Sequence, residues 1–228
     1  MREPLIIGHR GASAVAPENT LTAFKSAVLA GADGIEFDVR LSGDDVPVII
    51  HDDTLYRTHR MRQSVADLSA AELGDLGVPS LRELFELMRG NELLLCLEMK
   101  GSSAELAERC CGLVREFSFA ERTIVECFDL NVLKLVDLKT AALFEPRIYA
   151  DKYIVERALE VGASVLALHH RSAQAPLVER AKLAGLRVVV WTVDDPAWIA
   201  RARSLGIDAL ITNDPAKMIE AADRIAYS

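Results

Sequence analysis

Three acidic side chains lie in β-rich segments with a spacing that suits metal-assisted chemistry. Glu36 and Asp38 are two residues apart, so on a strand they point the same way, and Glu98 belongs to a later β-rich segment. Converging carboxylates repel one another unless a cation neutralises them. Oxygen ligands without a cysteine or multi-histidine set favour Mg²⁺, Ca²⁺ or Mn²⁺ over Zn²⁺. We therefore predict that the three hold one divalent cation; the alternatives are ordinary carboxylates at strand ends, or a simple pair between Glu98 and Lys100.

His9 and His51 are predicted to supply acid–base chemistry at such a site. Cleavage of a phosphodiester needs a deprotonated attacking oxygen, a protonated leaving oxygen and stabilisation of the extra negative charge. Imidazoles titrate near neutral pH and suit the first two needs, but the sequence leaves open which histidine is the acid and which the base. Arg10 and Lys100 are predicted phosphate contacts, with salt bridges to the same carboxylates as the alternative.

Trp191 and Glu18 are further candidates for contact with a substrate. The Trp191 ring suits stacking on the apolar face of a small polyol, although a tryptophan in a strand often belongs to the core. Glu18 follows Pro17, and an acidic residue there is also explained by the start of a helix. Glu145 and His170, at later strand ends, remain candidates without an assigned role.

Short β-rich runs recur and are usually followed by ten or more residues with helical periodicity, which is the pattern of parallel βα units. The runs are Leu5–His9, Gly34–Val39, Val46–His51, Leu93–Lys100, Thr123–Phe128, Ala141–Glu145, Val165–His169, Arg187–Val193 and Ala209–Asn213. The predicted helices are Glu18–Leu29, Ser80–Met88, Ala104–Phe117, Leu130–Leu138, Lys152–Val161, Ala175–Ala184, Pro196–Leu205 and Pro215–Arg224, several of them ending before a glycine that suits a C-cap.

The second and third runs are predicted to form a hairpin, because the few residues between them are too short for a helical crossover. The other eight runs are the number that closes a (β/α)₈ TIM barrel. A two-residue turn at Gly43-Asp44, with positive φ at Gly43, sets His51 opposite Glu36. A turn shifted by one residue per strand sets His51 opposite Asp38. In both registers His51 shares a sheet face with the two carboxylates.

Length and composition favour one domain over residues 1–228 that binds a small molecule. The 228 residues are 50% hydrophobic, and a net charge of -8 disfavours nucleic acid and anionic membranes as partners. No signal peptide or transmembrane run is recognised, and four cysteines without CxxC spacing indicate reduced thiols in the cytoplasm. The one long connection, residues 52–79 with a short helix near 67–73, is placed where a lid or inserted lobe would lie.

An ordered set of motifs resembles the glycerophosphodiester phosphodiesterase family. The motifs are His9-Arg10-Gly11, Pro17-Glu18-Asn19-Thr20, Glu36-Phe37-Asp38-Val39, His51-Asp52, Leu97-Glu98-Met99-Lys100, Trp191-Thr192-Val193 and Thr212-Asn213-Asp214-Pro215. They span nearly the whole chain in order, which makes the set far more specific than any single motif.

The resemblance implies a barrel related to phosphatidylinositol-specific phospholipases C that releases glycerol 3-phosphate and an alcohol from glycerophosphodiesters. It assigns the metal to Glu36, Asp38 and Glu98 and acid–base roles to His9 and His51. It also places Arg10 and Lys100 on the phosphate and Glu18 near the glycerol and the metal. A glycerol hydroxyl that forms a cyclic phosphate is one implied route, and direct attack by water is the other. The state of association is left open between monomer and homodimer.

Two departures from the family pattern, Cys127-Phe128 and Phe144-Glu145-Pro146-Arg147, leave the preferred alcohol undecided. Three other functions fit the sequence less well. A metal-dependent amidohydrolase would show His-x-His on the first strand, where this chain has His9-Arg10. A lipid-directed relative would need an apolar entrance, whereas the start of the 52–79 segment is polar. A silent barrel that only binds a phosphorylated metabolite would lack one of the carboxylates or histidines, and all are present.

Overall fold

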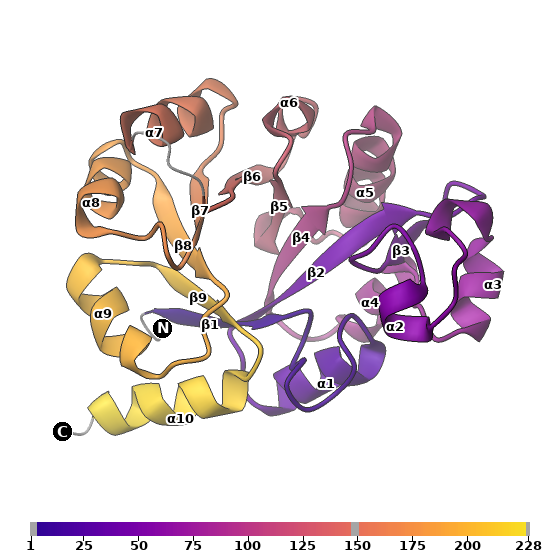
Figure 1. The fold of residues 1–228 in the computed structure, drawn as a ribbon, viewed down its shortest axis with the longest axis horizontal. Helices are drawn as coiled ribbons and strands as arrows, with labels where there is room; N and C mark the ends of the chain where they lie inside the picture. The colour runs from indigo at the N-terminus through magenta and orange to yellow at the C-terminus, as the bar shows by residue number, and fades with distance from the viewer. Residues whose placement is uncertain (1–3, 147–150, 227–228) are drawn as a thin grey trace.

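The computed structural model describes residues 4–146 and 151–226, whose strands form a closed barrel (Figure 1). The strands are β1 (Leu5–His9), β2 (Gly34–Leu41), β3 (Pro47–Ile49), β4 (Leu94–Met99), β5 (Thr123–Cys127), β6 (Lys139–Phe144), β7 (Val165–His169), β8 (Arg187–Trp191) and β9 (Ala209–Thr212). In the described part of the chain, eight parallel strands follow the order β1-β9-β8-β7-β6-β5-β4-β2, and β1 pairs with β2 to close the ring. The predicted TIM barrel is confirmed.

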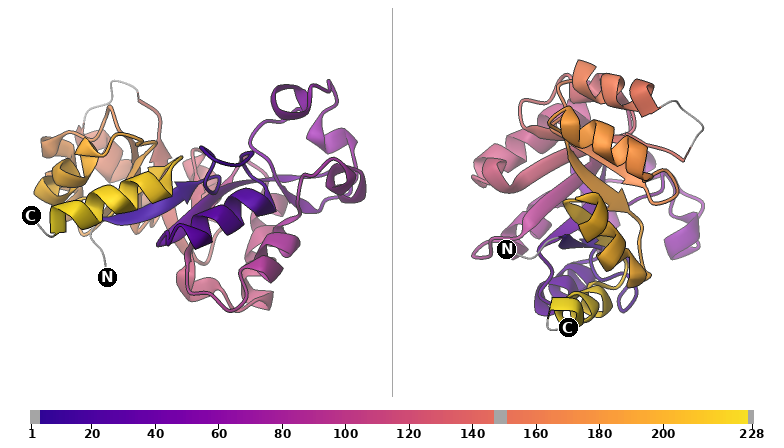
Figure 2. Two further views of the ribbon diagram at one scale, coloured as in Figure 1. Left: turned by 90° about the horizontal axis from the view of Figure 1, so that it is seen from below. Right: turned by 90° about the vertical axis from the view of Figure 1, so that its left-hand side faces the viewer.

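The helices surround the strands, and both further views of the ribbon show this arrangement (Figure 2). They are α1 (Leu21–Leu29), α2 (Tyr56–His59), α3 (Ala70–Asp75), α4 (Leu81–Leu87), α5 (Ala104–Glu116), α6 (Leu130–Leu133), α7 (Asp151–Glu160), α8 (Ala175–Leu183), α9 (Ala197–Leu205) and α10 (Pro215–Ala226), with 3₁₀ turns at Val65–Asp67 and Ala120–Arg122. No helix of the described residues is long and apolar enough to cross a membrane. All four cysteines are buried free thiols.

Strand alternation divides the core into an inner and an outer layer. On β4, Cys96 packs inside the barrel, whereas Leu95 and Leu97 pack against the helices. Small and branched side chains such as Ala167 and Val189 fill the same interior, as expected for a packed barrel rather than a pore. The last inward-facing position of each strand therefore opens onto the mouth of the barrel, and this layer contains the polar residues.

Two predicted helix boundaries are wrong. Helix α1 starts at Leu21, because the Thr20 hydroxyl accepts a hydrogen bond from the Ala23 N–H and caps the helix. Glu18 consequently lies in the preceding loop, where its side chain is free to reach the site. Helix α6 ends at Leu133 rather than residue 138, since the next three backbone N–H groups, of Lys134, Leu135 and Val136, donate to carbonyls three residues back and form turns. Asp214 caps α10 as expected, accepting from the Lys217 N–H at 3.1 Å.

The hairpin between β2 and β3 exists, but its register is neither of the two predicted. Val39 pairs with Ile49 and Leu41 with Pro47, so the turn is a three-residue loop closed by Asp45 at φ 59°. Gly43 does not adopt positive φ; a Cβ there would lie 2.8 Å from the Ala66 carbonyl oxygen, so glycine permits the close approach of residues 64–68.

The new register, continued along β3, would place His51 on the face away from Glu36. Strand β3 instead ends at Ile49, and the Ile50 N–H donates to the Asp38 carbonyl at 3.0 Å. The chain then leaves the ladder, and His51 reaches the mouth of the barrel from a bend. The prediction that His51 shares a sheet face with Glu36 and Asp38 is therefore wrong, although His51 does line the same cavity as Glu36.

The 52–79 segment folds as a small lobe at one side of the barrel, beside β3 (Figure 1). It contains α2, a 3₁₀ turn and α3; the short helix expected near 67–73 lies instead at Ala70–Asp75, because Ser69 and Glu72 form a capping box. Its apolar side chains form a core of their own with β3: Val48, Ile50, Leu55, Val65, Leu73 and Val78. This packing anchors the lobe next to the mouth.

Candidate active site

The inward-facing residues at the mouth of the barrel are level with one another across several strands. His9 is level with Glu36, Asp38 with Glu98, and Glu98 with Glu126. A cavity of about 300 Å³ opens there, lined by His9, Arg10, Glu36, His51, Glu98, Lys100, Glu126, Phe128, Leu143, Glu145, Trp191 and Ile211. The barrel register thus brings together groups that are separated by up to two hundred residues in the chain.

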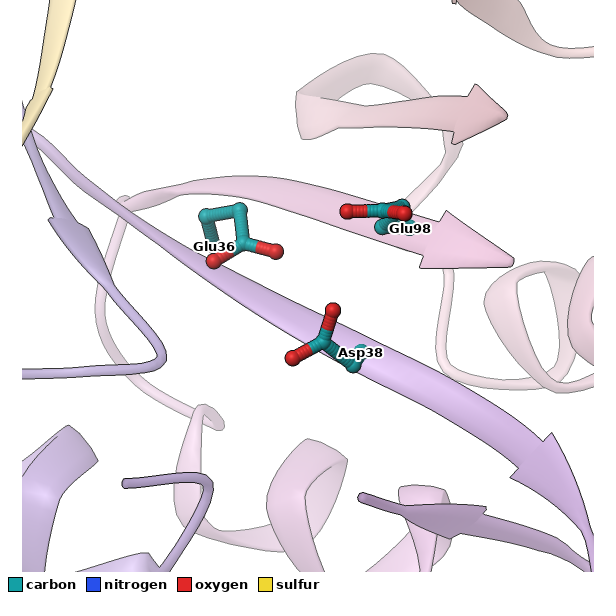
Figure 3. A group of neighbouring side chains, drawn as sticks. All are labelled: Glu36, Asp38 and Glu98. Carbon is teal, nitrogen blue, oxygen red and sulfur yellow. The ribbon is translucent and has the colours of Figure 1, made fainter. Parts of the chain in front are cut away.

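Glu36, Asp38 and Glu98 project side by side from β2 and β4 (Figure 3). One carboxylate oxygen of each lies within 4.8 Å of the others, which makes a cluster able to hold a metal ion among the described residues. The three residues are only 3%, 0% and 8% exposed. The alternative that they are ordinary surface carboxylates is therefore wrong.

Crowding and burial shift the pKa values of these groups in the protein without a bound cation. Burial, together with Asp38 and Glu98, raises the pKa of Glu36 well above its ordinary value, and burial raises that of Glu98 to about 7. Burial also raises the pKa of Glu126 to about 8. For Asp38, Lys100 and Arg10 outweigh burial and keep the pKa low. The site therefore holds more carboxyl groups than its own cations neutralise.

Lys100 and Arg10 provide the positive charge beside the cluster. The Lys100 ammonium lies 3.1 Å from Asp38 Oδ1 and also contacts Glu98. The Arg10 backbone N–H donates to Glu36 Oε2 at 3.0 Å, while its guanidinium lies 3.2 Å from Asp38 Oδ2 and donates to Glu18 Oε1 at 2.7 Å. These contacts agree with the predicted salt bridges. The phosphate-contact interpretation also fits, because both cations line the cavity.

The loop before α1 positions Arg10 and contacts Asp38, and two of its residues adopt backbone conformations that are uncommon for residues other than glycine. Arg10 has φ 54° and Asn19 has φ 58°. Asn19 is buried, its amide N–H donates to Asp38 Oδ2 at 2.7 Å, and its backbone N–H donates to the Arg10 carbonyl at 3.0 Å. A Cβ on Gly11 would lie 2.6 Å from the backbone of Ala23, so glycine is required where this loop packs on α1.

His9 has one ring nitrogen in a hydrogen bond and the other near the carboxylates. Its Nδ1 lies 2.7 Å from Asn213 Oδ1, and its Nε2 lies 3.9 Å from Glu36 Oε2. Burial, followed by the nearby Arg10, lowers the pKa of His9 to about 4. In the protein without a bound cation, the His9 imidazole is therefore neutral at neutral pH.

His51 belongs to a chain of ion pairs that connects the barrel with the 52–79 lobe. Its Nδ1 lies 2.6 Å from Asp52 Oδ1, and Arg57 in α2 donates from Nε to Asp52 Oδ2 at 2.7 Å. The same guanidinium donates to both carboxylate oxygens of Glu18, at 2.7 and 2.8 Å. Glu18 is thus paired with both Arg10 and Arg57, which together keep its pKa low despite partial burial.

Trp191 lies at the mouth rather than in the core, as its half-buried ring lines the cavity and packs edge-on against Phe128 at 5.7 Å between centroids. Its indole Nε1–H is buried without a hydrogen-bond partner in the described structure. Glu145 also lines the cavity, whereas His170 stacks on His169 at 4.1 Å and is not part of the lining. Arg147, in the second departure from the family pattern, lies outside the described residues.

Several residues of the site were missed by sequence reasoning. Glu126 is 1% exposed inside the barrel, and its position two residues after the inward-facing Ile124 was the signal that could have found it. Arg57 contacts the site through Glu18 and Asp52, and Asp194, which follows β8, does so by accepting from the Asn213 amide; no local pattern indicates such contacts. Asn213 was assigned only to the strand end before a helix cap.

The fold and the site define the class: a TIM-barrel hydrolase whose chemistry lies at the C-terminal ends of the strands. Residues 9–217 match the model of the glycerophosphoryl diester phosphodiesterase family. The chain is 33% identical to the glycerophosphodiester phosphodiesterase of Caldanaerobacter subterraneus subsp. tengcongensis, over 94% of this chain and 96% of that protein. It belongs to this family and is a phosphoric diester hydrolase.

Solved structures agree with this assignment. The glycerophosphodiester phosphodiesterase of Thermotoga maritima superposes with a TM-score of 0.86 at 28% identity, covering 96% of this chain and 99% of that one. A phosphodiesterase of Oleispira antarctica, solved in complex with the product sn-glycerol-3-phosphate, superposes with a TM-score of 0.86 at 27% identity, covering 96% and 97%. The predicted family and enzyme class are confirmed.

Proposed function

We propose that this phosphodiesterase hydrolyses glycerophosphodiesters to sn-glycerol 3-phosphate and an alcohol, using one divalent cation and the two histidines. The observation that carries the proposal is the buried cluster of Glu36, Asp38 and Glu98 with His9 and His51 lining the same cavity. The product complex of the Oleispira antarctica relative supports sn-glycerol 3-phosphate as the retained product.

The three carboxylates fit a divalent cation on chemical grounds. Glu36 Oε1 is buried without a hydrogen-bond partner in the described structure, while the buried Asp38 Oδ1 and Glu98 Oε1 both contact the Lys100 ammonium, whose single charge offsets only part of theirs. Their oxygen donors suit Mg²⁺, Ca²⁺ or Mn²⁺. When bound there, such a cation would neutralise the carboxylates and polarise an oxygen of the phosphate.

The other residues of the site then have distinct tasks. His9 and His51 transfer protons to and from the attacking and leaving oxygens, since both imidazoles line the cavity. Arg10 and Lys100 stabilise the negative charge of the transition state. Glu18 lies next to Arg10 and orients it, and Trp191 offers an apolar ring and an unpaired indole N–H to the glycerol.

The nucleophile of the first step is either a glycerol hydroxyl or water. Attack by the hydroxyl gives a cyclic phosphate that water opens, whereas direct attack gives the products in one step. Trapping of the cyclic phosphate by rapid quench distinguishes the two routes. We favour a water-soluble diester in the cytoplasm as substrate, because the four cysteines are buried and unpaired and the net charge of -8 repels anionic membranes and nucleic acid.

The deciding experiment assays release of glycerol 3-phosphate from glycerophosphocholine and glycerophosphoethanolamine. The purified chain is tested in EDTA and after addition of Mg²⁺, Ca²⁺ or Mn²⁺, beside the Glu36→Ala and His9→Ala variants. We expect cation-dependent release by the unmodified chain and a loss of about 10²-fold or more in each variant. If a folded chain releases no product with any of the cations, the proposal fails for these substrates.

A further inference from the structure

A short hydrogen-bonded relay connects His9 with Asp194, which lies outside the cavity lining. His9 Nδ1 lies 2.7 Å from Asn213 Oδ1, and the Asn213 amide nitrogen Nδ2 lies 2.7 Å from Asp194 Oδ2. Asn213 follows β9 and Asp194 follows β8, the two strands that precede β1 in the ring. Neither the metal site nor the phosphate contacts require this connection.

Asp194 decides which way the Asn213 amide points. A carboxylate only accepts hydrogen bonds, so the amide group facing it must be the NH₂ donor. Asp194 Oδ1 is held by the Asn213 backbone N–H at 2.8 Å and the Thr212 hydroxyl at 2.9 Å, which fixes the carboxylate itself. Burial alone would raise the pKa of Asp194, but these hydrogen bonds outweigh it and keep the pKa low, so the acceptor is ionised at neutral pH.

The orientation of the amide in turn decides the tautomer of His9. With its NH₂ toward Asp194, Asn213 presents Oδ1 to His9, and this oxygen also accepts from the Ser13 hydroxyl at 2.9 Å. A neutral imidazole carries one proton, which must lie on Nδ1 to donate to that oxygen. Nε2, the nitrogen on the side of Glu36, is then left without a proton.

We infer that Asp194 is a positioning residue that, through Asn213, holds the His9 proton on Nδ1 and leaves Nε2 as the proton acceptor of the reaction. His9 is thereby assigned as the general base. The inference rests on the proposed function for its catalytic meaning, while the control of the tautomer is a property of the protein alone. Asp194 touches no substrate and acts only through the orientation of Asn213.

The test is the Asp194→Asn substitution, which keeps size and shape but turns Oδ2 into a donor. The Asn213 amide must then rotate to offer its oxygen to the new NH₂ group, and its own NH₂ turns toward His9 Nδ1. We expect the His9 proton to move to Nε2, which ¹⁵N NMR of the full chain with Mg²⁺ at neutral pH detects from the imidazole nitrogen shifts. We expect kcat to fall about 10²-fold or more, with KM changed far less.

A double variant separates this role from a merely structural one. In Asp194→Asn combined with Asn213→Asp, the donor and the acceptor are exchanged, so a carboxylate again accepts from His9 Nδ1 and from the amide at position 194. We expect the Nδ1–H tautomer to return and kcat to recover to within about 10-fold of the unmodified chain, a departure from additivity that two independent defects would not produce.

Asp195→Asn is the matched control, since it removes the same charge one residue along, where the Asp195 side chain accepts from the Ala197 N–H at the start of α9 and is not part of the relay. It should leave the tautomer and kcat unchanged. The inference is overturned if Asp194→Asn keeps the proton on Nδ1, or if the double variant fails to restore it. If the tautomer responds as expected but the unmodified chain releases no glycerol 3-phosphate, then the proposed function fails and the control of the tautomer stands.

Discussion

Individual carboxyl groups at this site differ because their surroundings differ. Asp38 accepts from Asn19 and contacts Lys100 and Arg10, so its pKa stays low, whereas burial, together with the neighbouring Asp38 and Glu98 carboxylates, raises the pKa of Glu36. Glu126 lies one strand further from those cations and is 1% exposed, so burial dominates. The pKa values of Asp38 on β2 and Glu126 on β5 are thus shifted in opposite directions within the same polar layer.

Glu126→Gln should change stability in a pH-dependent way. Because the folded protein raises the pKa of Glu126 from 4.5 to about 8, it binds this proton more tightly than the unfolded chain does. The contribution of Glu126 to the free energy of unfolding therefore falls as pH rises from about 4.5 to about 8. Urea unfolding in EDTA should show the variant gaining stability relative to the unmodified chain across that window; a difference independent of pH would contradict it.

At the scale of elements, the 52–79 lobe contributes to the site through Arg57 of helix α2. Arg57 joins the lobe to Glu18 of the β1–α1 loop and, within the lobe, pairs with Asp52 beside His51. The lobe also packs on β3 through its own apolar core. The role of the lobe as a lid remains a proposal, and the Arg57 contacts are where such a role would act.

Arg57→Ala should lower kcat/KM by about 10-fold, because the loss releases both Glu18 and Asp52 from their positions beside Arg10 and His51. The fold should lose no more than about 1 kcal/mol, since the guanidinium is 46% exposed and its pairs are solvent-screened. Steady-state kinetics and urea unfolding check both. Arg62→Ala, at an exposed position of the same lobe, is the control and should change neither.

Gly43→Ala should destabilise the hairpin contact with the lobe by about 1–3 kcal/mol, because the added Cβ would lie 2.8 Å from the Ala66 carbonyl oxygen. Gly112→Ala is the opposite case. It lies within α5, where an added Cβ meets nothing within 4 Å, and should stabilise by about 0.5–1 kcal/mol. Chemical unfolding of both variants distinguishes steric conflict from the general effect of replacing glycine; equal shifts would refute the explanation.

At the scale of the whole molecule, the barrel buries several acidic groups at one end of its core, so the proposed cation should stabilise the fold. At a Mg²⁺ concentration near 100 times Kd, binding to the native state adds about 2.7 kcal/mol. For a chain of this size, that corresponds to a rise in Tm of roughly 5–10 °C. Calorimetry of the unmodified chain should show the rise, and Glu98→Gln should abolish it; an equal rise in the variant would place the cation elsewhere.

The amino-acid sequence by itself determined the eight barrel strands, each to within two residues, and it pointed to the carboxylates and histidines of the proposed site. It could do so because strand alternation and helix periodicity are local patterns, and because the C-terminal ends of parallel strands meet at one mouth. The family resemblance rested on the same residues.

The tertiary structure alone decided the register of the hairpin, the course of the chain at His51, and the partners of Arg57 and Asp194. A turn register depends on the loop conformation of Asp45 and on the approach of Ala66, neither of which a repeating pattern contains. The relay from Asp194 to His9 joins residues 185 positions apart, and only closure of the barrel between β9 and β1 brings them together. Hydrogen bonds over such separations depend on three-dimensional packing, which is why no local signal predicted them.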